Sequence, residues 1–193
     1  MIIKDVKANS IYAESAKSFS APNLEKAKGI WTDKAKKFSA PNLEKAECIY
    51  APLAKSFSAP KLKEVKHIWT YSAETFSIPK LKKVDGDIQA KSAKTFSVPQ
   101  LIEANSIFVK LAKEFSAPEL KKVWQIYAES AKKFSAPELK KTDDIWANSA
   151  KTFSVPKLIE AGWICADSAK KFSAPKLKEA DNIYANSAET IEL

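Results

Sequence analysis

Apolar residues recur along this chain with a period of 19 residues. Each unit begins with an isoleucine, and the isoleucines stand at positions 11, 30, 49, 68, 88, 107, 126, 145, 164 and 183. An alanine follows each isoleucine five residues later, and a Phe-Ser-small-Pro block comes next, as in Phe19-Ser20-Ala21-Pro22. One step is 20 residues long, because an extra residue enters around Asp85-Gly86-Asp87. A fixed period of this length predicts a solenoid.

Alternation within the unit favours short strands. In Ile11-Tyr12-Ala13 and its copies, a period of two places Ile and Ala inward and the middle residue outward. Phe19-Ser20-Ala21 is a second segment of this kind, and Leu24 and Ala27 add two inward positions. Identical residues would then stack on identical residues. The sequence therefore predicts a mainly β fold, a single parallel β-solenoid of about ten 19-residue coils.

An α-solenoid of 19-residue helices is the alternative. Ser-x-Pro-Glu before Leu120 is typical of an N-capped amphipathic helix. The positions just before each isoleucine oppose this alternative, since they hold all three glycines of the chain. Glycine in the middle of a helix costs about 1 kcal/mol relative to alanine, and Pro52 would cost about 3 kcal/mol. We therefore predict a chain corner at these positions, as at Lys28-Gly29 and Asp85-Gly86-Asp87.

The repeat leaves no linker, so we predict one repeat domain over residues 1–193. Residues 1–10 are expected to form an N-terminal cap segment, residues 11–182 nine full repeats, and residues 183–193 a partial C-terminal coil. In the last unit Ile191 stands where the other units have phenylalanine.

The repeat unit Ile-Tyr-Ala-x-Ser-Ala-Lys-x-Phe-Ser-Ala-Pro-x-Leu-Lys-x-Val resembles the bacterial leucine-rich-repeat-like solenoids related to receptor L domains. The resemblance covers nearly the whole chain. The double glycine that the family has at its corner is mostly missing here, with Val84-Asp85-Gly86-Asp87 the nearest case. The resemblance implies a binding or structural solenoid, and it implies no catalytic residues.

The basic residues, the N-terminal sequence and the cysteines indicate which partners and which compartment to expect. All 32 basic residues are lysines, and the net charge is +9. Because arginine is the preferred residue for bidentate contacts to guanine and phosphate, we expect no sequence-specific nucleic-acid recognition. We expect neither a signal peptide nor a transmembrane segment, which predicts a cytoplasmic chain as written. Cys48 and Cys165 are expected to remain unpaired.

No residue pattern predicts an enzyme. His67 is the only histidine, and with two distant cysteines it cannot furnish a zinc site. Asp85 and Asp87 fall short of the six to eight oxygen ligands that Ca²⁺ takes. The three glycines stand alone and form no phosphate-binding loop. We expect no catalytic residue, no cofactor and no metal.

An outward column of aromatic residues, here called the aromatic ladder, is the first candidate site. It follows the isoleucines and consists of Tyr12, Trp31, Tyr50, Trp69, Phe108, Tyr127, Trp146 and Tyr184, with Gln89 and Cys165 in the two other coils. At a coil spacing of about 4.8 Å it would run for roughly 43 Å. Two interpretations stay open: the rings bind a partner, or they stabilise the sheet by stacking on one another.

A column of lysines, here called the basic stripe, is the second candidate site. It comprises Lys17, Lys36, Lys55, Lys94, Lys113, Lys132, Lys151 and Lys170, with Glu74 and Glu189 in the two other coils. Like charges about 5 Å apart repel one another within a Debye length. The stripe predicts either an acidic partner or, as we favour from the sequence, a solvated edge that is partly neutralised by neighbours such as Glu14, Asp33 and Glu129.

Together these patterns predict a non-enzymatic repeat scaffold that binds a protein through the aromatic ladder. A glycan is the less favoured ligand, and an acidic polymer remains an alternative for the basic stripe. The second function is a structural solenoid that associates with copies of itself, head to tail or face to face.

Overall fold

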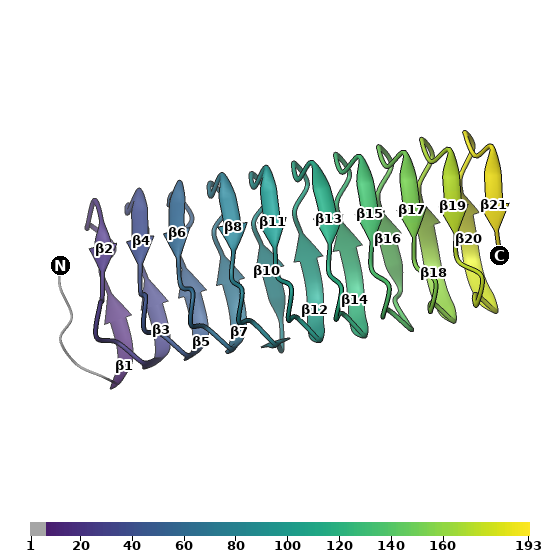
Figure 1. Cartoon of the computed structure of the whole chain (residues 1–193). Coiled ribbons are helices and arrows are strands. Elements are labelled where there is room, and N and C mark those ends of the chain that lie inside the picture. Colours follow the sequence, from purple (N-terminus) through teal and green to yellow (C-terminus); the bar gives the residue numbers. More distant parts are fainter. Residues whose placement is uncertain (1–6) are drawn as a thin grey trace.

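The computed structural model describes residues 7–193, which form a solenoid of strands stacked from one end of the chain to the other (Figure 1). Parallel pairing joins each residue to the equivalent residue of the next coil, as in Ile11↔Ile30 and Phe19↔Phe38. The predicted parallel β-solenoid is confirmed, and the α-solenoid is not supported. Residues 7–193 contain no helix long and apolar enough to cross a membrane.

One side of every coil belongs to a single 11-stranded sheet, here called the wide sheet. Its strands are β1 (Lys7–Tyr12), β3 (Lys26–Trp31), β5 (Lys45–Tyr50), β7 (Glu64–Trp69), β9 (Lys83–Val84), β10 (Asp87–Gln89), β12 (Glu103–Phe108), β14 (Lys122–Tyr127), β16 (Asp144–Trp146), β18 (Glu160–Cys165) and β20 (Glu179–Tyr184). The sheet follows this order along the stack, with β9 pairing both β7 and β12. Of the predicted N-terminal cap, residues 1–6 lie outside the described residues, and residues 7–10 belong to β1.

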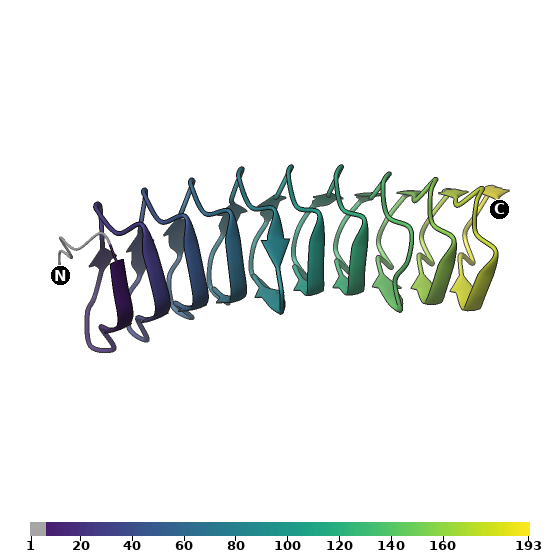
Figure 2. The same ribbon diagram turned by 90° about the horizontal axis from the view of Figure 1, so that it is seen from below.

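Two five-stranded sheets, here called the Phe–Ser sheets, form another side of the coils (Figures 1 and 2). The first contains β2 (Phe19–Ser20), β4 (Lys37–Ser39), β6 (Ser56–Ser58), β8 (Thr75–Ser77) and β11 (Thr95–Ser97). The second contains β13 (Glu114–Ser116), β15 (Lys133–Ser135), β17 (Thr152–Ser154), β19 (Lys171–Ser173) and β21 (Thr190–Glu192). In the other nine strands the phenylalanine is buried and its two neighbours in the chain point outward. In β21 Ile191 replaces the phenylalanine and is exposed.

The core is a set of inward columns, as the alternation predicts. The isoleucines at 30, 49, 68, 88, 107, 126, 145 and 164 are fully buried, and the alanines that follow them five residues later line the same interior. Phenylalanine rings stack along the interior, with centroids 4.8 Å apart for Phe115 and Phe134 and 4.9 Å apart for Phe134 and Phe153. Packing of identical side chains at the coil spacing explains why the sequence period hardly varies.

The predicted corner just before each isoleucine is wrong for most coils, although the chain does bend at Asp85-Gly86 and at Asp143. Lys28 and Gly29 lie inside β3, and the chain instead turns at residues such as Glu14–Ser15 and Pro22–Asn23. Glycine is not needed there for a left-handed backbone conformation, since no described residue has a positive φ. Its missing side chain instead leaves room for a neighbouring ring at two of the three glycines. A Cβ on Gly29 would lie 2.0 Å from the ring of Trp31, and one on Gly86 would lie 2.2 Å from the ring of His67.

The same positions nevertheless interrupt the simple alternation of the strand. Ala27 and Ile30 are both buried in the core although they lie three residues apart, so two residues stand between them. Lys28 is exposed, and Gly29 is buried beneath the outward ring of Trp31. The coil with the extra residue shows the interruption most clearly, because Asp85-Gly86 separates β9 from β10. Two successive outward residues per coil give the wide sheet a broader outer surface than a period of two would give.

Candidate binding surfaces

The structure places the aromatic ladder on the outer face of the wide sheet, at the last residue of each long strand. Tyr12 and Tyr184, in the first and last coils, are exposed, and the six aromatic side chains between them are half-buried. Cys165, which interrupts the ladder, is only 4% exposed. The ladder therefore presents ring edges along most of its length.

Stacking divides the ladder into separate groups. Tyr12 and Trp31 stack with ring centroids 4.8 Å apart. Phe108 and Tyr127 also stack at 4.8 Å, and the series continues to Trp146 at 6.2 Å. Tyr50 and Trp69 instead meet edge to face at 5.9 Å. Aromatic pairs of these kinds contribute about 0.5–1.5 kcal/mol each beyond their burial, so part of the ladder's role is to stabilise the sheet.

Three further rings on this face were not among the predicted site residues. Trp163 stacks between Trp146 and Tyr184, at 6.5 and 6.0 Å, and so bridges the gap that Cys165 leaves. His67 stacks on Trp69 at 5.2 Å. Trp124 is 58% exposed, the most exposed tryptophan among the described residues. Their signal in the sequence is an aromatic ring in the columns before the isoleucines, where the sequence predicts a corner.

Trp124 borders an open groove of about 430 Å³ on the wide sheet. The groove is lined by Val84, Asp85, Glu103, Ala104, Asn105, Lys122, Val123, Trp124, Lys141 and Asp143. A second groove of about 760 Å³ lies farther along the same sheet and includes Gly162, Trp163 and Asp181. Asp143 and Lys141 line both grooves, so the two exposed tryptophans flank one continuous stretch of the surface.

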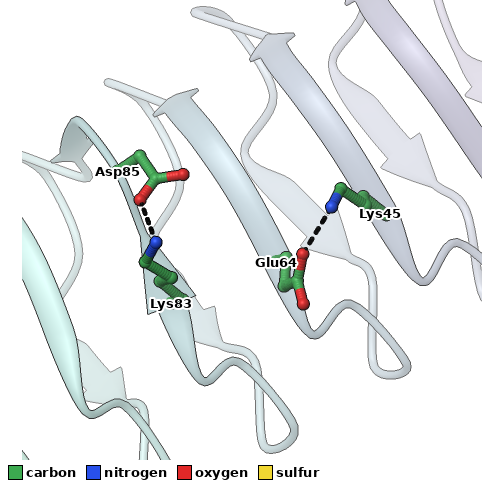
Figure 3. A network of polar contacts seen from close by, with 4 residues as sticks. All are labelled: Lys45, Glu64, Lys83 and Asp85. Carbon is green, nitrogen blue, oxygen red and sulfur yellow. Dashed lines mark hydrogen bonds and ion pairs between the residues drawn. The ribbon is translucent and has the colours of Figure 1, made fainter.

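Several charges on the wide sheet are paired, either between neighbouring coils or within one coil. Lys45 Nζ lies 2.6 Å from a carboxylate oxygen of Glu64, and Lys83 Nζ lies 2.7 Å from Asp85 (Figure 3). Lys141 pairs with Glu160 in the same way. The hydrogen bond and the attraction of Lys45 lower the pKa of Glu64, and Glu64 raises the pKa of Lys45. These pairs are exposed, so each contributes little to stability, but together they leave this face nearly neutral.

The basic stripe lies elsewhere, at the edge of the Phe–Ser sheets. Its residues stand two positions before each phenylalanine, and all of them are exposed. Among residues 7–193, Lys170 is the one stripe lysine that forms an ion pair, at 2.7 Å from Glu189. The predicted neutralising neighbours Glu14 and Asp33 form no ion pair within that part of the chain, and Glu129 pairs with Lys110.

Reactive side chains are few on either surface. Cys48 and Cys165 are free thiols six coils apart, in β5 and β18, and burial raises the pKa of each. Residues 7–193 contain no group of three or more His, Cys, Asp or Glu side chains placed to hold a metal ion. The grooves are open surface features lined by charged and small side chains together with Trp124 and Trp163, a form suited to contact with another molecule.

No protein-family model, no curated protein and no solved structure matches this chain.

Proposed function

We propose that this chain is a non-enzymatic binding module that docks a protein on the wide sheet, with Trp124 and Trp163 as anchors. The observation that carries the proposal is the exposure of these two tryptophans beside open grooves on the same sheet. Tryptophan is among the side chains most enriched at the energetic centres of protein interfaces. A side chain of the partner would enter a groove, and the indole rings of Trp124 and Trp163 would pack against the partner's surface around that side chain.

Ring geometry favours a protein over a glycan on this face. A sugar ring packs on the flat face of an aromatic ring, and several ladder rings cover one another's faces at about 5–6 Å. Ring edges together with paired charges suit a protein surface that offers apolar side chains within a mixed-charge rim. The partner we propose is a protein of that kind.

We also propose the leucine-rich-repeat-like assignment. It is supported by the order of features within a coil, a parallel strand followed by a Phe-Ser-small-Pro-x-Leu segment that turns at the proline. Binding through one continuous solenoid sheet is consistent with that assignment.

Site-directed photo-cross-linking tests the docking surface. A photoreactive residue at position 124 should capture a discrete protein, and the same residue at position 116, on β13, should not. Once a partner is captured, Trp124→Ala should weaken its binding by about 2 kcal/mol in calorimetry, as a hot-spot residue would. Lys122→Ala, which changes a neighbouring groove residue without removing a ring, is the matched control and should have a much smaller effect.

The alternative outcomes are distinct. Cross-links only between copies of this chain, with light scattering that shows concentration-dependent growth, would replace the proposal with the self-associating solenoid. Equal capture at positions 124 and 116 would show that the wide sheet is not a specific docking surface.

A further inference from the structure

Charge is distributed unevenly between the two sides of the solenoid. The wide sheet has eight lysines and ten acidic side chains at its outward positions, a net charge of −2. The three outward positions around each Phe–Ser strand, which are the basic stripe and the two residues flanking the phenylalanine, have 11 lysines and four glutamates. That net charge of +7 supplies most of the chain's +9.

The basic stripe is held at a constant spacing over its whole length. A backbone hydrogen bond joins the stripe residue of each coil to that of the previous coil, with N–O distances such as 3.0 Å for Lys36 and Lys17 and 2.7 Å for Lys132 and Lys113. The series continues without a gap to Glu189, even past the break between β11 and β13. Stripe positions therefore follow one another at about 4.8 Å along a single line, and lysine occupies every position from Lys17 to Lys170 except that of Glu74.

Hydroxyl groups form a parallel row beside the lysines. Serine follows phenylalanine in nine successive coils, at positions 20, 39, 58, 77, 97, 116, 135, 154 and 173. The residue before phenylalanine adds further hydroxyls, and Thr95 Oγ1 donates to Thr75 Oγ1 at 3.2 Å. Eight of these nine coils thus offer a hydroxyl donor next to an ammonium donor, the exception being the coil of Glu74 and Ser77. This combination binds carboxylate, sulfate or phosphate oxygens.

We propose that this face binds an extended acidic polysaccharide, whose carboxylate or sulfate groups lie along the basic stripe. Seven of its eight lysines have no ion pair within residues 7–193, and their mutual repulsion, which acts within a Debye length of about 8–10 Å, is relieved when a polyanion neutralises them. This proposal does not depend on the protein-docking surface, which lies on the wide sheet.

A straight row of lysines suits an extended polymer better than a nucleic acid. Phosphates of a DNA duplex wind around the axis once in about 34–36 Å. The stripe lysines from Lys17 to Lys170 form a single row roughly 38 Å long, which would meet each DNA strand only where the strand crosses it. Single strands bind through base stacking on aromatic rings, and no outward position around the Phe–Ser strands holds an aromatic residue. An anionic membrane would find no large apolar side chain to insert at these outward positions.

Calorimetry over a series of NaCl concentrations tests the proposal with the full chain. The probes are an unbranched galacturonate oligosaccharide, a heparin oligosaccharide, a 30-base-pair DNA duplex and phosphatidylserine vesicles. We expect an oligosaccharide to bind more tightly than the duplex or the vesicles. Lys94→Gln, Lys113→Gln, Lys132→Gln and Lys151→Gln combined should weaken oligosaccharide binding about tenfold or more and flatten its salt dependence, because four contacts to anionic groups are lost.

A control variant removes the same charge from the wide sheet. Lys26→Gln, Lys28→Gln, Lys66→Gln and Lys122→Gln combined should leave oligosaccharide affinity within about twofold of wild type. Replacing the four stripe lysines by arginine should preserve binding, and Trp124→Ala should not change it. Equal losses in the two glutamine variants, tighter binding of the duplex or the vesicles, or no oligosaccharide binding at low salt would each overturn the proposal.

Discussion

Small inward residues make each coil narrow. Alanine occupies the inward position five residues after every isoleucine, and alanine or another small residue precedes most prolines, as at Ala40 and Ala136. Phenylalanine is the largest core side chain, and its ring fills the space that the alanines leave. At the scale of single residues, stability therefore depends on how closely the phenylalanine rings stack.

Removing one ring should destabilise the solenoid according to its local packing. Phe134 is 1% exposed and has neighbouring rings at 4.8 and 4.9 Å, so Phe134→Ala should lower the free energy of unfolding by about 3–5 kcal/mol. Phe96 is 7% exposed with rings at 5.5 and 5.6 Å, so Phe96→Ala should cost less. Urea denaturation followed by circular dichroism measures both, and equal losses would contradict the role of stacking distance.

A buried hydroxyl offers a stabilising substitution. Thr70 is fully buried, and its Oγ1 has no hydrogen-bond partner among the described residues. Val109 occupies the equivalent position of another coil and is also fully buried, so valine fits there. Thr70→Val should raise the free energy of unfolding by about 1 kcal/mol, since an unsatisfied buried group is removed.

Thr142 provides the matched control in the same denaturation experiment. Its Oγ1 donates to the carbonyl of Trp124 at 3.0 Å, so Thr142→Val should lower stability where Thr70→Val raises it. A stabilised Thr142→Val protein would show that the hydrogen bond contributes nothing net.

At the scale of the strand, the break in the alternation of inward and outward residues determines which side chains lie on the outer face of the wide sheet. Two neighbouring residues face outward before each isoleucine, and a third outward residue, the ladder residue, follows it. The long strands thus present both ladder rings and residues such as Trp124 and Trp163 on one surface. In β3 the outward position two residues before Trp31 is Gly29, and the ring of Trp31 lies over it.

Filling the space at Gly29 should displace the Trp31 ring. The new Cβ of Gly29→Ala would lie 2.0 Å from the ring in its present position, so the stack with Tyr12 should be lost. We expect an altered near-ultraviolet circular dichroism spectrum and a loss of about 0.5–1.5 kcal/mol in unfolding free energy. Ser106→Ala, at the equivalent position in β12, should change neither, and an unchanged spectrum for Gly29→Ala would contradict the ring placement.

At the scale of the whole molecule, each coil is stabilised mainly by its two neighbours. The last coil of the 193-residue chain has one neighbour, and Ile183, Ile191 and Leu193 in it are exposed. The middle of the stack is not uniform either, since the Phe–Ser sheets separate between β11 and β13. Nearest-neighbour coupling of this kind makes local stability depend on position along the stack.

Hydrogen exchange should reveal this gradient. Backbone amides of β20 and β21 should exchange faster than those of β14 and β15, because opening the last coil breaks contacts on one side only. Uniform protection along the chain, measured by mass spectrometry of peptides, would indicate that the solenoid opens as a single cooperative unit.

The repeat alone determined the stacking neighbours in this protein. In-register parallel pairing places each residue beside its copy 19 positions away, so inward Ile, Phe and Leu columns and an outward basic stripe follow directly from the period. Tertiary structure decided where each coil turns and which rings touch. Glycine at position 29 is equally compatible with a turn and with a neighbouring ring that needs space, and only the folded coil shows that Trp31 occupies that space. Trp124 and Trp163 likewise became candidate anchors only when the strand was seen to continue through the predicted corner, because outward exposure depends on the bend and not on the period.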